Sequence, residues 1–188
     1  ELGMTTAHYN DISQYRDVES LNYYKILLDQ GKTKGQALAI LAARSRDNSR
    51  TPMQWSAAQN AGFTEGTPWI EAPENYKEIN AETELKDPDS IYSFYKKLIT
   101  LRKEKDIIAE GTIEFLEKEN ADVLAYRRSY HGEELIVLNN LTAENVTIRQ
   151  QPKWKAYQKL LGNYEKITAE DGKITLRPFE TIVLDSAL

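Results

Sequence analysis

The densest group of polar side chains that could do chemistry lies in the segment Arg44–Trp55. Its sequence, Arg-Ser-Arg-Asp-Asn-Ser-Arg-Thr-Pro-Met-Gln-Trp, places three arginines, one aspartate and one asparagine beside a tryptophan. A guanidinium offers N–H donors in a fixed fork, which suits a two-point grip on a carboxylate or on neighbouring sugar hydroxyls. The same arginines could instead neutralise a helix end and lock a loop through Arg–Asp pairs, and the residue types alone favour this structural role.

A second candidate is the pair Asp17 and Glu19. Asp17 could cap a helix with Glu19 in its first turn, which is the more common role of such residues, or Glu19 could line a cleft. Aromatic residues between positions 45 and 80 could stack on sugar rings, but such residues are more often buried, so we expect them to be core residues or loop anchors. These residues are Trp55, Phe63, Trp69 and Tyr76.

The composition excludes several other kinds of site. The chain has no cysteine and only two histidines, His8 and His131, which rules out a Cys nucleophile and nearly rules out a multi-histidine metal site. The sequence lacks a phosphate-binding glycine loop, a dinucleotide fingerprint, a nucleophile elbow and a zinc-protease helix motif. We therefore expect no metal, no cofactor and no self-sufficient active site, and we expect both histidines at the surface, with His131 in a hairpin turn.

Charge and hydropathy limit the partners. The formal net charge of −5 argues against a nucleic-acid partner, which usually requires a basic face. No apolar run approaches the roughly 18 residues that would span a membrane. Because the sequence begins with Glu1 and shows no signal peptide, we expect a processed chain or a piece of a longer one.

The first half of the chain is predicted to consist of helices and long loops. Asp17 can cap a helix through Leu28 that Gly31 ends, and Thr33 with Gln36 forms a capping box for a second helix. Apolar residues at helical spacing predict a third helix over residues 89–105, with basic residues toward its end.

The second half is predicted to consist of short strands joined by turns, which is typical of an antiparallel β-sandwich. The predicted strands are Thr112–Leu116, Val123–Ser129, Leu135–Asn139, Val146–Arg149, Ala156–Leu161, Tyr164–Ile167, Lys173–Leu176 and Thr181–Leu184. We expect the aromatic residues of this half, among them Trp154 and Phe179, to fill the sandwich and its seam rather than form a sugar-binding platform.

The segment Ser45–Trp55 resembles a signature of α-glucosidases in the α-amylase family of glycoside hydrolases, and further matches follow in the same order along essentially the whole chain. The supporting segments are 1–5, 15–22, 60–64, 67–70, 75–80, 95–103 and 176–180. The resemblance implies a fold class: an α/β barrel fragment, the end of a (β/α)₈ barrel, followed by an all-β antiparallel sandwich domain. Residues 1–105 would be the end of the barrel and residues 106–188 the sandwich. Residues 1–5 would form the end of the eighth barrel strand and the loop after it, and residues 89–105 would form the eighth helix.

The resemblance also implies a site. Family members are retaining hydrolases whose three catalytic carboxylates would lie upstream of Glu1, so the chain alone is expected to be inactive. Arg46 matches an arginine that holds the far hydroxyls of the cleaved glucose, and Glu19 matches a residue lining the neighbouring subsite. Asp47 and Arg50 would brace the loop. The implied partners are a small α-linked carbohydrate and the rest of the barrel, with no nucleic acid and no membrane.

Within the family, Ser49 and the segments Ile79–Glu82 and Leu85–Asp87 resemble bacterial trehalose-6-phosphate hydrolases most, which implies a cytoplasmic enzyme. Oligo-1,6-glucosidases and dextran glucosidases are the alternative. Two further interpretations stay open: an amylase-like interaction domain without activity, and a carbohydrate-binding module in residues 106–188.

Overall fold

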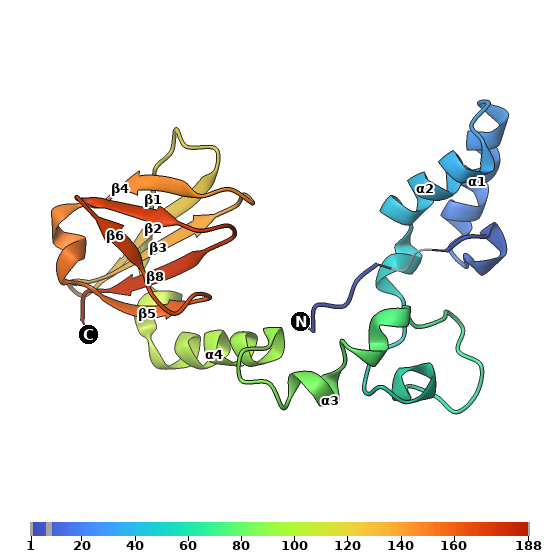
Figure 1. Cartoon of the computed structure of the whole chain (residues 1–188), viewed down its shortest axis with the longest axis horizontal. Coiled ribbons are helices and arrows are strands. Elements are labelled where there is room, and N and C mark those ends of the chain that lie inside the picture. The colour runs from blue at the N-terminus through green and yellow to red at the C-terminus, as the bar shows by residue number, and fades with distance from the viewer. Residues whose placement is uncertain (1, 7–8, 188) are drawn as a thin grey trace. The chain divides into compact units, whose positions relative to one another are not determined.

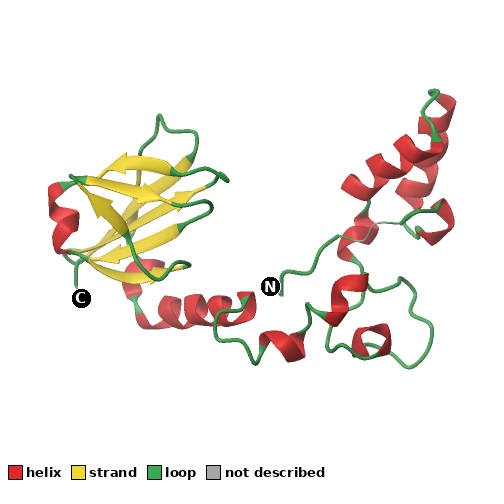
Figure 2. Ribbon diagram, in the orientation of Figure 1, coloured by secondary structure: helices red, strands yellow, loops and turns green. Residues whose placement is uncertain are grey.

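The structure is a computed structural model that describes residues 2–6 and 9–187, so the expected position of His8 lies outside the described residues. The chain forms two compact units, Glu1–Leu98 and Ile99–Leu188. Figure 2 shows that the N-terminal unit is built from helices and loops, while the strands lie in the C-terminal unit. No helix in the described residues is long and apolar enough to cross a bilayer.

Two antiparallel helices, α1 (Val18–Asp29) and α2 (Lys34–Arg44), pack together in the N-terminal unit (Figure 1). The Asp17 carboxylate accepts the Ser20 N–H at the start of α1, and Thr33 with Gln36 forms the predicted capping box of α2. Their facing sides bury a small apolar cluster. It consists of Tyr9, Tyr15, Tyr24, Leu27, Ala37, Leu41 and Ile70.

The rest of the N-terminal unit is mostly loop with short helices, as the glycines and prolines of residues 45–80 predict. The short α-helix α3 is Ala81–Glu84, and 3₁₀ helices occupy Ile12–Gln14, Arg46–Ser49, Gln59–Gly62 and Glu74–Lys77. Residues 2–6 form no strand in the structure, and Gly3 has a positive φ of 72°. A strand end needs a neighbouring strand to pair with, so the expected end of a barrel strand and the loop after it at residues 1–5 stay a prediction.

The third predicted helix is α4 (Ile91–Glu104), and the short helix α5 (Asp106–Ala109) follows it. The Ser90 hydroxyl accepts the Ser93 N–H at the start of α4. One face of α4 carries apolar side chains that are exposed to solvent in this chain. They are Ile91, Tyr95, Leu98 and Ile99.

The C-terminal unit contains two antiparallel sheets with strand orders β1-β2-β3-β8-β5 and β4-β7-β6. The strands are β1 (Thr112–Leu116), β2 (Val123–Tyr130), β3 (Glu133–Asn140), β4 (Val146–Arg149), β5 (Gln158–Gly162), β6 (Thr168–Glu170), β7 (Lys173–Leu176) and β8 (Thr181–Asp185). His131 and Gly132 both have positive φ between the paired residues Tyr130 and Glu133, so they form the predicted two-residue hairpin turn, and His131 is exposed.

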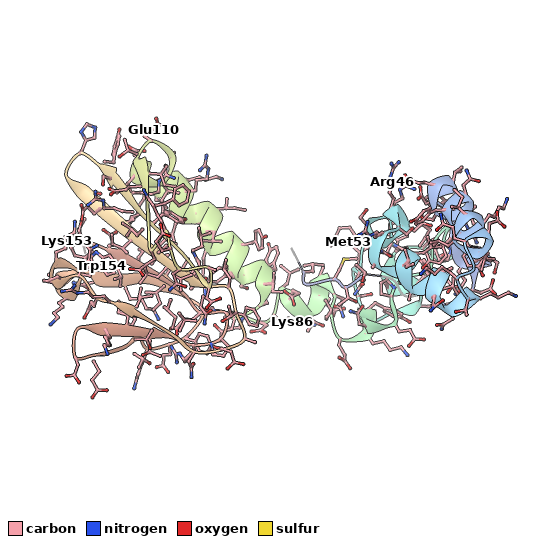
Figure 3. The ribbon with its side chains drawn as sticks, turned by 90° about the horizontal axis from the view of Figure 1, so that it is seen from above. Arg46, Met53, Lys86, Glu110, Lys153 and Trp154 are labelled. Atoms are coloured by element: carbon pink, nitrogen blue, oxygen red, sulfur yellow. The ribbon has the colours of Figure 1, made fainter. Side chains whose placement is uncertain are left out.

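The two sheets enclose one apolar core, to which both contribute, so the expected sandwich is confirmed. Trp154 is buried in this core from a 3₁₀ helix, Pro152–Ala156, that precedes β5 (Figure 3). The predicted strand at Ala156–Leu161 therefore begins two residues later, at Gln158, because the 3₁₀ helix holds Ala156. Phe179 is 60% exposed, so it does not fill the sandwich core, and its expected place in the seam between the sandwich and the barrel stays a prediction.

The predicted strand Tyr164–Ile167 is wrong, and side chains explain why. The Lys159 ammonium donates to the carbonyls of Tyr164 at 2.6 Å and Glu165 at 2.7 Å, and Arg177 donates to the Lys166 carbonyl. These hydrogen bonds occupy backbone carbonyl oxygens that would otherwise accept hydrogen bonds from a neighbouring strand. The strand on this edge, β6, forms at Thr168–Glu170 instead.

We expect the 188-residue chain, purified alone, to self-associate as its concentration rises. The exposed apolar face of α4 and the small core of the N-terminal unit give the reason, since a contiguous apolar patch left in water promotes association. Gel filtration over a concentration series, with light scattering, measures this. Replacing Ile99 by Lys should shift the chain toward monomer, and a wild-type chain that stays monodisperse and melts cooperatively would contradict the expectation.

Candidate functional site

Arg46 and Glu19, the two predicted ligand-binding residues, meet at the surface of the N-terminal unit. Arg46 Nη2 lies 2.9 Å from Glu19 Oε2, and the side chains are 65% and 70% exposed, respectively. Glu19 comes from the first turn of α1, and Arg46 begins the 3₁₀ helix that follows α2, where Figure 3 shows it at the edge of the unit. Because so exposed an ion pair adds little to stability, both side chains remain available to a ligand.

Beneath this pair, the Asp47 side chain is completely buried. Its Oδ2 accepts the backbone N–H of Arg16 at 2.6 Å and of Asp17 at 2.9 Å. Arg50 Nη1 lies 3.5 Å from Asp17 Oδ1 and 3.6 Å from Asp47 Oδ1, which supplies positive charge to two neighbouring carboxylates. The segment before α1 is thereby joined to the turn after α2.

Two serines that the sequence analysis did not single out complete this network. The Ser20 hydroxyl lies 2.9 Å from both Asp17 Oδ2 and the Ser45 hydroxyl, and Ser45 Oγ accepts the Asp47 N–H at 3.2 Å. Ser45 is the residue before a helical turn, so its preference for the N-cap position was the signal that could have found it.

The environment keeps the Asp17 carboxylate ionised. Burial alone would raise its pKa, but hydrogen bonds from Ser20 and the charges of Arg50 and Arg46 outweigh burial and lower the pKa below its ordinary value. A lowered native pKa means that Asp17 stabilises the fold above the unfolded pKa of about 4 and that this stability is lost as the pH falls through the native value. The network is therefore intact at neutral pH.

Glu19 and Arg46 line a hollow of about 690 Å³ that continues along one face of α1. Asn22, Tyr23 and Ile26 lie on this face, three, four and seven residues after Glu19, and all three are exposed. The sequence analysis missed them, although helical spacing from Glu19 would have placed them on its side of the helix.

The arrangement can grip a polar ligand, but it does not by itself provide a reaction. A guanidinium and a carboxylate 2.9 Å apart offer donors and acceptors that match neighbouring hydroxyls. Over residues 2–6 and 9–187, no group of three His, Cys, Asp or Glu side chains is placed to hold a metal ion.

Of the four loop aromatics, which we expected to be core residues or loop anchors, three are not core residues. Trp55, Phe63 and Trp69 are 53%, 52% and 63% exposed, and only Tyr76 is partly buried. Their backbones are fixed by the loop, but their rings face solvent in this chain.

Two family models match the chain. A model described as "Alpha amylase, catalytic domain" covers residues 1–111, and one described as "Alpha-amylase SusG C-terminal domain" covers residues 123–183. The first match includes every residue of the Arg46–Glu19 site and its supporting network.

Sequence relatives agree with these models. The trehalose-6-phosphate hydrolase of Bacillus subtilis is 48% identical over 190 residues, and the oligo-1,6-glucosidase of Parageobacillus thermoglucosidasius is 41% identical over 187, each match covering 97% of this chain. The match covers 33% of each relative, so the chain spans about a third of their length.

A solved structure matches the fold as well. The crystal structure of Bacillus licheniformis trehalose-6-phosphate hydrolase superposes with a TM-score of 0.92 at 45% identity, covering 98% of this chain and 34% of that one. The catalytic-domain model matches more than half of the chain, the matched structure has the same fold, and the Ser45–Trp55 signature is in place. The chain therefore belongs to the α-amylase family of glycoside hydrolases.

Proposed function

We propose that this chain is the C-terminal part of a retaining α-glucoside hydrolase that cleaves trehalose 6-phosphate into glucose and glucose 6-phosphate. The observation that carries the proposal is the exposed Arg46–Glu19 pair on one rim of a hollow, held by a buried network. Support for this substrate comes from the trehalose-6-phosphate hydrolases of Bacillus subtilis and Escherichia coli, which are 48% and 44% identical to the chain.

In this proposal the chain supplies substrate contacts and the remaining protein supplies the reaction. Arg46 donates hydrogen bonds to the hydroxyls of the glucose ring that is transferred, and Glu19 accepts hydrogen bonds from the sugar in the adjacent subsite. Asp47 and Arg50 brace the loop that carries Arg46. The nucleophile and the acid/base, both carboxylates in a retaining hydrolase, would lie outside the 188 residues.

The proposed organisation places the barrel end in residues 1–105 and the sandwich domain in residues 106–188. The partners would be the sugar substrate and the rest of the barrel. The proposed location is the cytoplasm, because a phosphorylated disaccharide is charged and does not cross a lipid bilayer unaided.

A second candidate is an oligo-1,6-glucosidase, which several relatives favour. Three such enzymes are 40% to 41% identical to this chain over the same region, only slightly less than the trehalose-6-phosphate hydrolases. The two candidates differ in whether the leaving sugar carries a phosphate. Comparing the rates of hydrolysis of a phosphorylated and an unphosphorylated substrate therefore distinguishes them.

A chimera tests the proposal. The first two thirds of the Bacillus subtilis trehalose-6-phosphate hydrolase, joined to this chain in place of its own matched third, should hydrolyse trehalose 6-phosphate faster than isomaltose. The chain alone should hydrolyse neither, because it lacks the reacting carboxylates, and glucose release measures both. A preference for isomaltose favours the second candidate, and turnover by the chain alone contradicts the proposal.

Arg46→Ala in the chimera should lower kcat/KM about 100-fold, since a hydrogen bond from a charged donor to the bound sugar contributes about 1.5 to 3 kcal/mol. Glu19→Gln, which keeps the shape but removes the charge, should lower kcat/KM about tenfold on the same scale. Arg149→Ala, at an exposed position of the C-terminal unit, is the matched control and should leave hydrolysis unchanged. If the Arg46 and Arg149 substitutions change kcat/KM equally, Arg46 does not contact the substrate.

Asp47→Ala should destabilise the protein by about 3 kcal/mol or more, because the N–H groups of Arg16 and Asp17 would lose their buried acceptor. Asp29→Ala removes an exposed carboxylate near the end of α1 and is the matched control. The midpoint of urea denaturation measures both. If the two substitutions shift the midpoint equally, Asp47 does not brace this loop.

A further inference from the structure

The residues next to Glu19 and Arg46 in the sequence are joined to each other. Ser20 follows Glu19 in the first turn of α1, and Ser45 precedes Arg46 at the end of α2. The two serine hydroxyl oxygens lie 2.9 Å apart, and both residues are buried, with exposed fractions of 4% and 7%. One buried hydrogen bond therefore links the two chain segments that carry the exposed groups of the candidate site.

The direction of this hydrogen bond follows from the number of protons available. Ser20 Oγ lies 2.9 Å from Asp17 Oδ2 as well as from Ser45 Oγ, but a serine hydroxyl has only one proton to donate. An ionised carboxylate only accepts hydrogen bonds, and the Ser45 hydroxyl has no other acceptor in the described part of the chain. Every group is satisfied when the Ser20 hydroxyl donates to Asp17 and the Ser45 hydroxyl donates to Ser20.

The backbone of the turn after α2 belongs to the same chain of hydrogen bonds. Ser45 Oγ accepts the Asp47 N–H at 3.2 Å, so the donors run in one direction from this turn to the ionised Asp17 carboxylate. Asn48 Nδ2 donates to the Ala42 carbonyl at 2.7 Å and ties the turn to the end of α2. Because rotating either serine hydroxyl would leave a buried group unpaired, the turn has one favoured position relative to α1.

The spacing of two binding groups matters only to a ligand that contacts both. In the proposed function, Arg46 holds the glucose that is transferred and Glu19 contacts the adjacent sugar, so a disaccharide spans the pair. A glucoside whose leaving group has no hydroxyl donates no hydrogen bond to Glu19. A displacement of about 1 Å between the two groups therefore slows hydrolysis of a disaccharide and affects the other glucoside much less.

We propose that the hydroxyls of Ser20 and Ser45 form a positioning link, which sets the spacing of the two substrate-binding groups and so favours substrates that span both. Each serine acts through its neighbour in the chain, Glu19 or Arg46, and not on the substrate itself. The proposal rests on the proposed function for the identity of the substrate, whereas the link itself rests on the observed geometry.

The test compares two substrates of the full-length protein, trehalose 6-phosphate and p-nitrophenyl α-D-glucopyranoside. Ser45→Ala should lower kcat/KM about tenfold for trehalose 6-phosphate and about twofold or less for the nitrophenyl glucoside, whose leaving group has no hydroxyl. Ser13→Ala removes an exposed hydroxyl from the same unit and is the matched control, which should leave both values unchanged. A merely structural role of Ser45 would lower both values equally, and equal losses would overturn the proposal.

Ser20→Ala breaks the same link from its other side and should change the ratio of the two kcat/KM values in the same direction. Because both substitutions remove one shared interaction, the double variant should lose no more than the weaker of the two single variants. Losses that multiply in the double variant would show two independent contributions and contradict a shared link.

A crystal structure of the Ser45→Ala protein gives a readout that needs no turnover. The distance between Arg46 Nη2 and Glu19 Oε2, 2.9 Å with the link intact, should lengthen beyond the roughly 4 Å of an ion pair. An unchanged pair would overturn the proposal even in a protein that hydrolyses trehalose 6-phosphate. A wild-type protein that hydrolyses neither trehalose 6-phosphate nor isomaltose would refute the proposed function instead, and the measured distance would still decide whether the serines position the pair.

Discussion

The N-terminal unit depends on one buried carboxylate, that of Asp47. Its Oδ2 accepts two successive backbone N–H groups, those of Arg16 and Asp17, from a segment about 30 positions away along the chain. Charge-assisted bonds to main-chain donors in a buried place are strong and directional, so they set the position of α1 relative to the turn after α2. Asp17 also lines the hollow of Glu19 and Arg46, so part of the wall of this hollow belongs to the segment that Asp47 holds.

The C-terminal unit is stabilised in a different way. Its sheets enclose an apolar core around Trp154, where hydrophobic burial is the main contribution. Hydrogen bonds between charged groups add to this at the edge of the unit. There the buried Glu180 carboxylate accepts hydrogen bonds from the Arg177 backbone N–H at 2.7 Å and from the Arg177 guanidinium. That guanidinium also lies 4.0 Å from the centre of the Tyr164 ring. The sandwich is thus a self-contained core, whereas the N-terminal unit relies on a polar network more than on apolar volume.

The sequence predicted those parts of the fold that are decided locally. Caps at Asp17 and Thr33 and helical periodicity gave α1, α2 and α4 with ends close to those observed, and turn residues such as His131–Gly132 gave the hairpins. The strand predicted at Tyr164–Ile167 failed because Lys159, five residues before Tyr164, and Arg177, eleven residues after Lys166, donate hydrogen bonds to its carbonyls. The alternation of residue types that predicts a strand does not show such side-chain contacts. Exposure of Trp69 could not be predicted either, since burial depends on which segments surround a ring and not on the residue type.

The candidate site, like the fold, combines features that the sequence shows locally with features that only tertiary contacts decide. Arg46 and Glu19 were identified by resemblance to a motif, but their separation of 2.9 Å follows from tertiary contacts that no spacing in the sequence contains. An ion pair this exposed contributes little to stability, yet the network beneath it, through Ser20, Ser45 and Asp47, is buried and closely hydrogen-bonded. Burying these polar groups costs free energy unless each one forms a hydrogen bond. A buried network of this kind therefore contributes more to fixing the positions of its residues than to stability. The position of Arg46 and Glu19 relative to each other is the geometry that this network fixes.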